Sequence, residues 1–237
     1  MPKPLIVITG ASAGIGKALA EEFVNDGHPC LLISRSIEPI AEFSGKDILY
    51  AQVDVSNYSA LEKAIRDAED KYGKTECLIN NAGMATIKLF NDVAVKKYEQ
   101  EVDVLLKGVL HGIKVVLADM QQRKSGTIIN ISSVGDRKPS PHAVSYSACK
   151  SAVRAISECL QMGEAKNNIR VMNIAPGLIR TEIHKAMGIS FEEYCELLGN
   201  PTFISTKELA DIIMFCWRQP KHICIRDIVV MPTDCDL

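Results

Sequence analysis

The sequence lacks the features of an exported, membrane-spanning or metal-binding chain. None of its apolar runs approaches the roughly 20 residues that a transmembrane helix needs. Met1 to Pro4 lead directly into an apolar run, without the h-region and cleavage site of a signal peptide. The eight cysteines include no CxxC pair and no compact His/Cys cluster, which argues against a disulfide framework and a zinc site. We therefore expect a cytoplasmic protein without a metal.

The sequence also lacks a strong charge imbalance, internal repeats and Gly/Ser linkers. Its formal net charge is -2, which gives no reason to expect nucleic acid or a membrane as a partner. Hydrophobic residues make up 47% and charged residues 24%, a globular composition. With 237 residues, a single domain spanning 1–237 is expected.

Short apolar runs alternate with amphipathic stretches along the chain, which is typical of βαβ units on a parallel sheet. The runs predicted as strands are Leu5–Ile8, Cys30–Ile33, Ile48–Val53, Cys77–Ile79, Thr127–Ile131, Arg170–Ile174 and Ile228–Met231. The spacing of apolar residues predicts helices over Ile15–Phe23, Leu61–Tyr72, Lys96–Gln122, Val144–Lys166 and Thr206–Trp217. The predicted fold is a single-domain, Rossmann-like, doubly wound α/β fold with seven parallel strands.

Residues 182–205 show no clear helix or strand pattern and follow a strand end, so we expect a substrate lid there. Its apolar side chains form a candidate pocket wall: Ile183, Met187, Ile189, Phe191, Tyr194, Leu197 and Leu198. The longest predicted helix has a wide apolar stripe, which favours packing against a second subunit.

A glycine-rich turn lies between the first predicted strand and helix. Thr9-Gly10-Ala11-Ser12-Ala13-Gly14-Ile15-Gly16 has the spacing GxxxGxG. Backbone amides and the helix dipole can meet a pyrophosphate there, although a glycine run alone also fits a plain tight turn.

The end of the second strand carries Ser34 and Arg35 rather than an acid. An acid at this place binds the ribose 2′-hydroxyl of NAD, whereas a basic residue suits a 2′-phosphate, so we predict NADP(H). Asp54 ends the third strand, where its carboxylate can accept a hydrogen bond from the adenine amine. Asn80-Asn81-Ala82-Gly83 follows the fourth strand, and Gly83 lets backbone approach the cofactor closely.

Candidate catalytic side chains follow the fifth strand. Ser132 and Ser133 lie at its carboxyl end, where open α/β sheets bind ligands. Tyr146 and Lys150 are four residues apart at the start of a helix, so they share one face. A phenol has a pKa near 10, and a neighbouring ammonium lowers it toward the range of an acid-base catalyst. A YxxxK spacing alone is common on solvated helix faces. It becomes specific here because the glycine turn, the basic end of the second strand, NNAG and the strand-end serine precede it in that order.

With these motifs in this order, the chain resembles the short-chain dehydrogenase/reductase family from Leu5 to about Met231. The resemblance implies that Tyr146 is the catalytic acid/base, that Lys150 lowers its pKa and binds the nicotinamide ribose, and that Ser133 holds the substrate oxygen. Pro176, Gly177 and Thr181 match the family's PGxxxT, whose threonine seats the carboxamide. The residues expected to contact the cofactor are Gly10, Ser12, Gly14, Ile15, Gly16, Arg35, Asp54, Asn81, Ala82, Gly83, Tyr146, Lys150, Pro176, Gly177 and Thr181.

Within the family, the tail Ile225–Ile228 followed by Met231-Pro232 looks most like that of small NADP-dependent hydroxy-acid and carbonyl reductases. The resemblance also implies homodimers or homotetramers joined through the two long helices. The expected substrate is a small carbonyl or alcohol compound. Arg137-Lys138 would suit an acidic substrate, but two adjacent charges are usually solvated.

The chain departs from the family pattern at two positions. Leu105 stands where the family has a catalytic asparagine that holds a water of the proton relay. Asp136 stands where glycine is frequent, which we expect to affect only the shape of the loop. Two functions therefore remain open: an oxidoreductase that transfers hydride with Tyr146 exchanging the proton, and an NADP(H)-binding sensor or scaffold with weak catalysis, which Leu105 favours.

Overall fold

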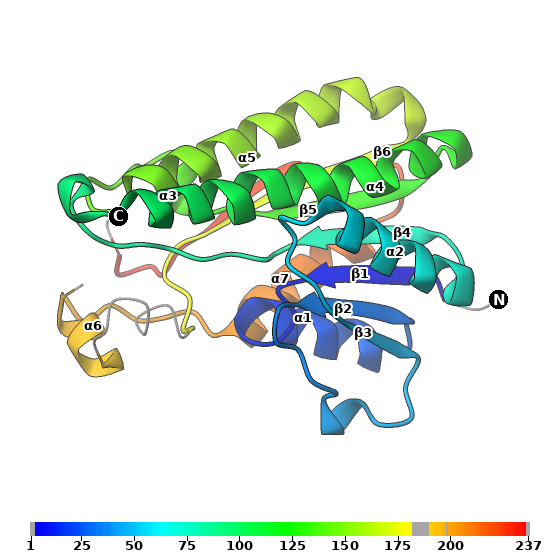
Figure 1. Cartoon of the computed structure of the whole chain (residues 1–237), viewed down its shortest axis with the longest axis horizontal. Helices are drawn as coiled ribbons and strands as arrows, with labels where there is room; N and C mark the ends of the chain where they lie inside the picture. Colours follow the sequence, from blue (N-terminus) through cyan, green and yellow to red (C-terminus); the bar gives the residue numbers. More distant parts are fainter. Residues whose placement is uncertain (1–2, 182–189, 198, 236–237) are drawn as a thin grey trace.

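The computed structural model describes residues 3–181, 190–197 and 199–235, and its centre is a seven-stranded parallel sheet (Figure 1). The strand order is β3-β2-β1-β4-β5-β6-β7, which confirms the doubly wound fold expected from the sequence. The strands are β1 Leu5–Thr9, β2 Cys30–Ser34, β3 Ile48–Gln52, β4 Thr75–Asn80, β5 Gly126–Ile131, β6 Ile169–Pro176 and β7 Asp227–Val230. Each agrees with a predicted apolar run to within two residues.

The central strands are apolar on both faces because helices cover the sheet on both sides. All residues of β1, β5 and β6 are buried, whereas β7 at the edge alternates between exposed and half-buried residues. Alternate residues of β1 supply the two cores. Ile6 and Ile8 pack in one core, and Leu5 and Val7 pack in the other.

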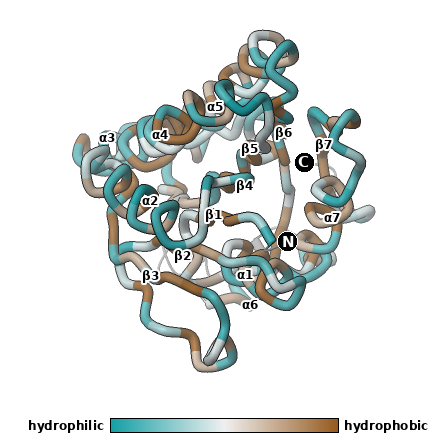
Figure 2. Tube along the Cα trace, turned by 90° about the vertical axis from the view of Figure 1, so that its right-hand side faces the viewer, coloured by the Kyte–Doolittle hydropathy of each residue, from teal (hydrophilic) through white to brown (hydrophobic). Residues whose placement is uncertain are grey.

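Two layers of helices enclose these cores (Figure 2). One layer contains α1 (Gly14–Asn25) and α7 (Thr206–Arg218). The other contains α2 (Tyr58–Tyr72), α4 (Gly108–Arg123) and α5 (Val144–Gly163). Short 3-10 turns lie at Ala41–Phe43, Phe90–Asp92, Val134–Asp136 and Ala165–Asn167. In the described ranges, no helix combines the length and the apolar character needed to cross a bilayer.

The long helix predicted over Lys96–Gln122 is not a uniform α-helix. It consists of α3 (Val95–Glu101), a π-helical segment (Val102–Lys107) and α4, which run on as one rod beside α5 in Figure 1. The backbone is closely packed where the π-helical segment meets α4, since a Cβ on Gly108 would lie 2.5 Å from Cγ2 of Val55. A π-helical turn takes up an extra residue and is frequent at functional sites. The apolar pattern does not reveal it, because the stripe continues through the wider turn.

The segment 182–205 contains a helix that its sequence pattern did not predict, α6 (Phe191–Leu197). The ring of Phe203 lies 5.1 Å from that of Phe191 and 5.9 Å from that of Tyr194, measured between centroids. A parallel bridge between Ile179 and Ile204 holds the end of the segment beside the chain that leaves β6. Residues 182–189 and 198 lie outside the described residues, so the predicted lid stays a prediction.

Candidate active site

The predicted site residues gather at the carboxyl ends of the parallel strands, beginning with the glycine turn after β1. Gly10 and Gly14 have φ angles of +67° and +58°, in the left-handed region that favours glycine. A Cβ on Gly10 would lie 2.7 Å from Cα of Ala82, and one on Gly16 would lie 2.2 Å from the carbonyl oxygen of Gly10. The turn therefore admits no side chain at these two positions. It brings backbone from β1 and β4 together.

The first turn of α1 offers unshielded amide groups to a ligand. Its N-cap residue, Ala13, makes no side-chain capping hydrogen bond. Helix N-termini carry unpaired N–H groups and partial positive charge, and a serine or aspartate cap would occupy them. The exposed Ser12 and half-buried Ile15 flank this position. The glycine cradle with an uncapped helix start fits the pyrophosphate of a dinucleotide.

Thr9, which no sequence motif marked as a site residue, organises the turn. Its hydroxyl accepts hydrogen bonds from the backbone N–H groups of Asn81 (3.0 Å) and Ala82 (3.1 Å). In return, the side-chain amide of Asn81 donates to the carbonyl oxygens of Thr9 (3.0 Å) and Gly10 (3.1 Å). These bonds hold the NNAG loop beside the glycine turn. The only sequence signal was a polar residue at the end of an otherwise apolar run.

Arg35 and Asp54 lie near each other at the ends of β2 and β3. Arg35 is exposed, and its charge acts on the carboxyl of Asp54. Burial alone would raise the pKa of Asp54, but hydrogen bonds from Ser56 and the charge of Arg35 outweigh it and hold the pKa below its usual value. The carboxylate accepts from the N–H (2.9 Å) and the hydroxyl (2.7 Å) of Ser56.

The structure brings Ser133, Tyr146 and Lys150 together. A hydrogen bond joins the side chains of Ser133 and Tyr146, and the ammonium of Lys150 lies 5.7 Å from the centroid of the tyrosine ring. The hydroxyl of Ser133 also accepts from the N–H of Gly135 at 3.1 Å. Lys150 is 6% exposed, and its ammonium donates to the carbonyl oxygen of Ile131 at 2.7 Å.

The lowering of the pKa of Tyr146 by Lys150 stays a prediction for the site with bound cofactor, because other groups dominate in the protein by itself. Burial raises the pKa of Tyr146 and outweighs the opposing hydrogen bond from Ser133, while the charges of Glu101, Tyr194 and Asp136 raise it further. Burial also lowers the pKa of Lys150 to about 8.

Asp136 does more than shape its loop, contrary to our expectation. It is buried, and its carboxylate accepts from the hydroxyl of Ser132 (2.8 Å) and the amide of Asn173 (3.1 Å). Arg137 donates to Asp136 at 2.6 Å and makes two hydrogen bonds of 2.9 Å to Asp227. Ser132 is thus committed to this network, which leaves Ser133 for Tyr146. The charge of Arg137 is matched inside the protein, so the structure does not favour it as an attractor of acidic substrates.

The PGxxxT segment closes the site on the side of β6. Pro176 ends β6, and the N–H of Gly177 donates to the carbonyl oxygen of Val230 at 2.8 Å. A Cβ on Gly14 would lie 3.6 Å from Cγ2 of Thr181, so the threonine faces the glycine turn. The segment and the turn therefore border the same space.

Leu105 lies where the sequence placed it, inside the protein. It is 1% exposed, in the π-helical segment, and a Cβ on Gly83 would lie 3.7 Å from its Cδ2. The leucine therefore packs against the NNAG loop.

The candidate pocket wall is described only in part. Ile183, Met187, Ile189, Leu198 and the side chain of Leu197 lie outside the described residues. Tyr194 is buried, and the guanidinium of Arg180 lies 5.0 Å from the ring centroid of Phe191. Tyr194 acts on the pKa of Tyr146, so α6 lies near this tyrosine.

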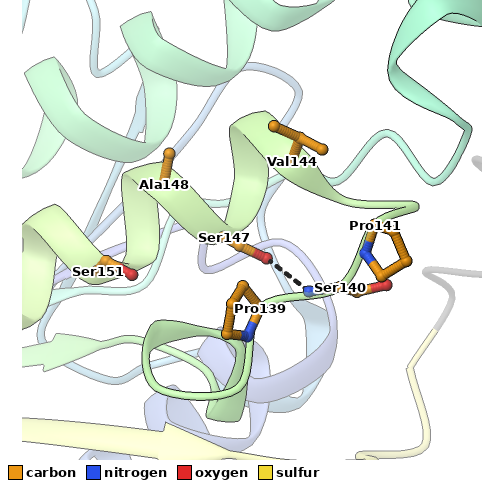
Figure 3. A pocket seen from close by; sticks show the side chains of 7 residues that line it. All are labelled: Pro139, Ser140, Pro141, Val144, Ser147, Ala148 and Ser151. Carbon is orange, nitrogen blue, oxygen red and sulfur yellow. Dashed lines mark hydrogen bonds between the residues drawn. The ribbon is translucent and has the colours of Figure 1, made fainter.

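A hollow of about 410 Å³ opens beside the first turns of α5 (Figure 3). It is lined by Pro139, Ser140, Pro141, Val144, Ser147, Ala148 and Ser151. The N–H of Ser140 donates to the hydroxyl of Ser147 at 3.4 Å across it. Neither Tyr146 nor Lys150 lines this hollow, so it is not the place where those residues would act.

The sequence profile described as short chain dehydrogenase matches residues 4–189. That span contains the glycine turn, the NNAG loop, Ser133, Tyr146 and Lys150. The chain belongs to the short-chain dehydrogenase family. It is therefore an oxidoreductase of that family. Curated relatives resemble it in sequence, and solved structures resemble it in fold.

Among curated relatives, an uncharacterised oxidoreductase of Listeria monocytogenes is 32% identical over 238 residues, covering 97% of this chain and 96% of the relative. Another from Staphylococcus saprophyticus is 29% identical, with 95% and 96% covered. Among solved structures, the closed form of a serine dehydrogenase complexed with NADP+ gives a TM-score of 0.89 at 27% identity, with 96% and 94% covered. A 3-oxoacyl-[acyl-carrier protein] reductase of Brucella melitensis with bound NAD gives 0.83 at 26% identity, with 99% and 91% covered.

Proposed function

We propose that this short-chain dehydrogenase is an NADP(H)-dependent enzyme that moves hydride between the nicotinamide and a carbonyl or alcohol carbon of a small substrate. The observation that carries the proposal is the cluster of Ser133, Tyr146 and Lys150 at the carboxyl ends of the strands, beside a glycine turn that fits a dinucleotide. The basic Arg35 and the NADP+ in the serine dehydrogenase favour NADP(H), whereas the Brucella reductase carries NAD.

Each side chain has a role that follows from its position. The Ser133 hydroxyl holds the substrate oxygen against Tyr146, which gives that oxygen its proton in reduction and takes it back in oxidation. Lys150 orients the ribose and returns a proton to the phenolate. The bound cofactor supplies or accepts the hydride. Pro176, Gly177 and Thr181 border the space where the carboxamide would lie.

The second function is an NADP(H)-binding sensor or scaffold with weak catalysis. Leu105 favours it, because a buried leucine cannot hold a water for the proton relay. The intact trio of Ser133, Tyr146 and Lys150 favours the enzyme. A panel of small aldehydes, ketones and 3-hydroxy acids, followed by NADPH absorbance, separates the two. A protein that binds NADPH tightly but turns over no member of the panel would be a sensor.

Tyr146→Phe tests the assigned proton donor. The ring still packs in its place while the hydroxyl is lost, so turnover should fall by about 10² to 10⁴. Binding of NADPH, measured by calorimetry, should change little. Ser147→Ala, one residue along α5, is the control and should keep most of the activity. Turnover of Tyr146→Phe within a few-fold of the unaltered protein would show that the proton comes from another group.

We also propose that the protein is a cytoplasmic homodimer or homotetramer joined through α4 and α5. Leu110 and Val144, on these two helices, are each 44% exposed, and exposed apolar groups favour an interface. All eight cysteines are free, as in a reducing compartment. The mass in solution, measured by light scattering, tests the oligomer.

A further inference from the structure

Glu101 is a carboxylate buried without a counter-charge in the part of the chain that the structure describes. It is the last residue of α3 and is 0% exposed. No ion pair to a lysine, arginine or histidine of the described ranges involves it. Burying an unpaired carboxylate is unfavourable unless hydrogen bonds compensate, so its place in the fold calls for a reason.

The two carboxylate oxygens of Glu101 join two segments that carry site residues. One oxygen accepts from the backbone N–H of Thr86, in the loop that follows NNAG, and the other accepts from the hydroxyl of Ser145. Ser145 lies in the first turn of α5, directly before Tyr146. The N–H of Lys88 donates to the carbonyl oxygen of His142 at 2.8 Å and adds a second link between the same segments.

We propose that Glu101 is a positioning residue for Tyr146: its carboxylate fixes the first turn of α5 against the loop after β4 and places a negative charge beside the helix turn that carries the tyrosine. The inference rests on the proposed role of Tyr146. The charge acts in alkaline solution, where it delays loss of the proton that the phenol donates in reduction.

Several groups act on the pKa of Tyr146. Burial raises its pKa first, the hydrogen bond from Ser133 lowers it, and the charges of Glu101, Tyr194 and Asp136 raise it. Lys150, which lies 5.7 Å from the ring, has a pKa that burial lowers to about 8. Among these three charges, Glu101 raises the pKa of Tyr146 the most.

Glu101 also affects the pKa of Cys149, which lies one turn further along α5. Burial raises the pKa of its thiol first, Glu101 raises it further, and Lys150 partly offsets the effect. The charge of Glu101 therefore acts on the side of α5 that carries Tyr146.

Glu101→Gln separates charge from positioning. The amide oxygen can accept from the N–H of Thr86, and the amide N–H can donate to the hydroxyl oxygen of Ser145, so both links survive while the charge is lost. Glu101→Ala removes the charge and both links. Asp103→Asn is the matched control: Asp103 lies on the π-helical segment, and its carboxylate accepts from exposed Lys107 at 2.7 Å.

With the best substrate from the carbonyl panel, Glu101→Gln should keep its turnover at low pH while the alkaline fall of the reduction rate moves to lower pH. Oxidation of the product alcohol should instead begin at lower pH than in the unaltered protein. Glu101→Ala should lose about tenfold or more in kcat, because the donor is misplaced, with little change in KM for NADPH. Asp103→Asn should match the unaltered protein in both directions.

A second measurement does not need turnover. With ¹³Cζ-labelled tyrosine, the NMR signal of each of the six tyrosines reports its ionisation, and Tyr146→Phe identifies the signal of Tyr146. Ionisation of Tyr146 should occur at lower pH in Glu101→Gln than in the unaltered protein or in Asp103→Asn. Equal ionisation in all three proteins would overturn the inference. A shifted signal in a protein that reduces no carbonyl would instead overturn the proposed function and leave the effect of Glu101 on Tyr146 standing.

Discussion

Arg35 is an exposed cation at the end of β2, where its main described effect is on Asp54. It makes no ion pair within 4.0 Å in the described ranges, so binding a phosphate there would not first require breaking an internal bridge. A guanidinium that contacts a phosphate makes charge-assisted hydrogen bonds, which are the stronger class. We therefore expect the choice between NADP(H) and NAD(H) to depend largely on this one side chain.

Arg35→Ala should weaken NADPH binding by about 1.5 to 3 kcal/mol, the scale of a hydrogen bond to a charged group. NADH lacks the 2′-phosphate, so its affinity should stay nearly constant. Calorimetric titration of both cofactors measures the difference, and Lys63→Ala, at an exposed position of α2, is the control for a general loss of positive charge. If the unaltered protein binds NADH as tightly as NADPH, the assignment of cofactor is wrong.

At this scale, the sequence revealed the residues whose partners are close along the chain. Tyr146 and Lys150 were found from their spacing of four, and the glycines from their run. Thr9 and Glu101 were missed, because their partners lie 72 and 44 positions away, at Asn81 and Ser145. A hydrogen bond between distant segments leaves no local pattern, so only the folded chain reveals it.

At the scale of elements, the rod formed by α3, the π-helical segment and α4 carries both unusual residues of the site. Glu101 ends α3, and Leu105 follows four residues later in the π-helical segment. The apolar stripe predicted the rod as a whole, and alternation of strand and helix predicted all seven strands. The π-helical turn escaped prediction because apolar periodicity reports which face is buried, whereas the number of residues per turn depends on contacts such as Gly108 with Val55.

Leu105→Asn tests whether this element limits catalysis. We expect the free energy of unfolding to fall by about 1 to 3 kcal/mol, because the amide would be buried among apolar groups. Turnover should not rise, since backbone and water can carry the relay. Urea unfolding and steady-state kinetics measure the two effects, and Leu105→Ala controls for lost packing. A gain in turnover would show that the leucine restrains the relay, and activity only in Leu105→Asn would support the sensor.

At the scale of the whole molecule, a buried charge of the site lowers the free energy of unfolding. Lys150 brings an ammonium into the interior, where one hydrogen bond to Ile131 compensates it only in part. Its folded pKa of about 8 lies below the ordinary 10.5. Between these values the unfolded chain holds a proton that the folded protein has released, so stability rises with pH across this window.

Lys150→Met should therefore raise the free energy of unfolding at pH 7 by about 1 kcal/mol, after the lost hydrogen bond to Ile131 is subtracted. The advantage should shrink at pH 9.5, where the unaltered protein has already lost the buried charge. Urea unfolding without cofactor at both pH values measures the gap, with Lys63→Met as the exposed control. An equal gap at the two pH values would show that the ammonium is not destabilising.

The strand order has a consequence for how the protein is made. β4 pairs with β1, which is already complete, and from β5 onward each new strand pairs with the strand synthesised just before it. The sheet can thus lengthen in one direction while the chain is still leaving the ribosome, because no strand waits for a later partner. The last strand, β7, also delivers Asp227 to Arg137. The Asp136–Arg137–Asp227 network can therefore close only after β7 has been synthesised, so the loop that carries Ser133 is fixed later than the strands before it.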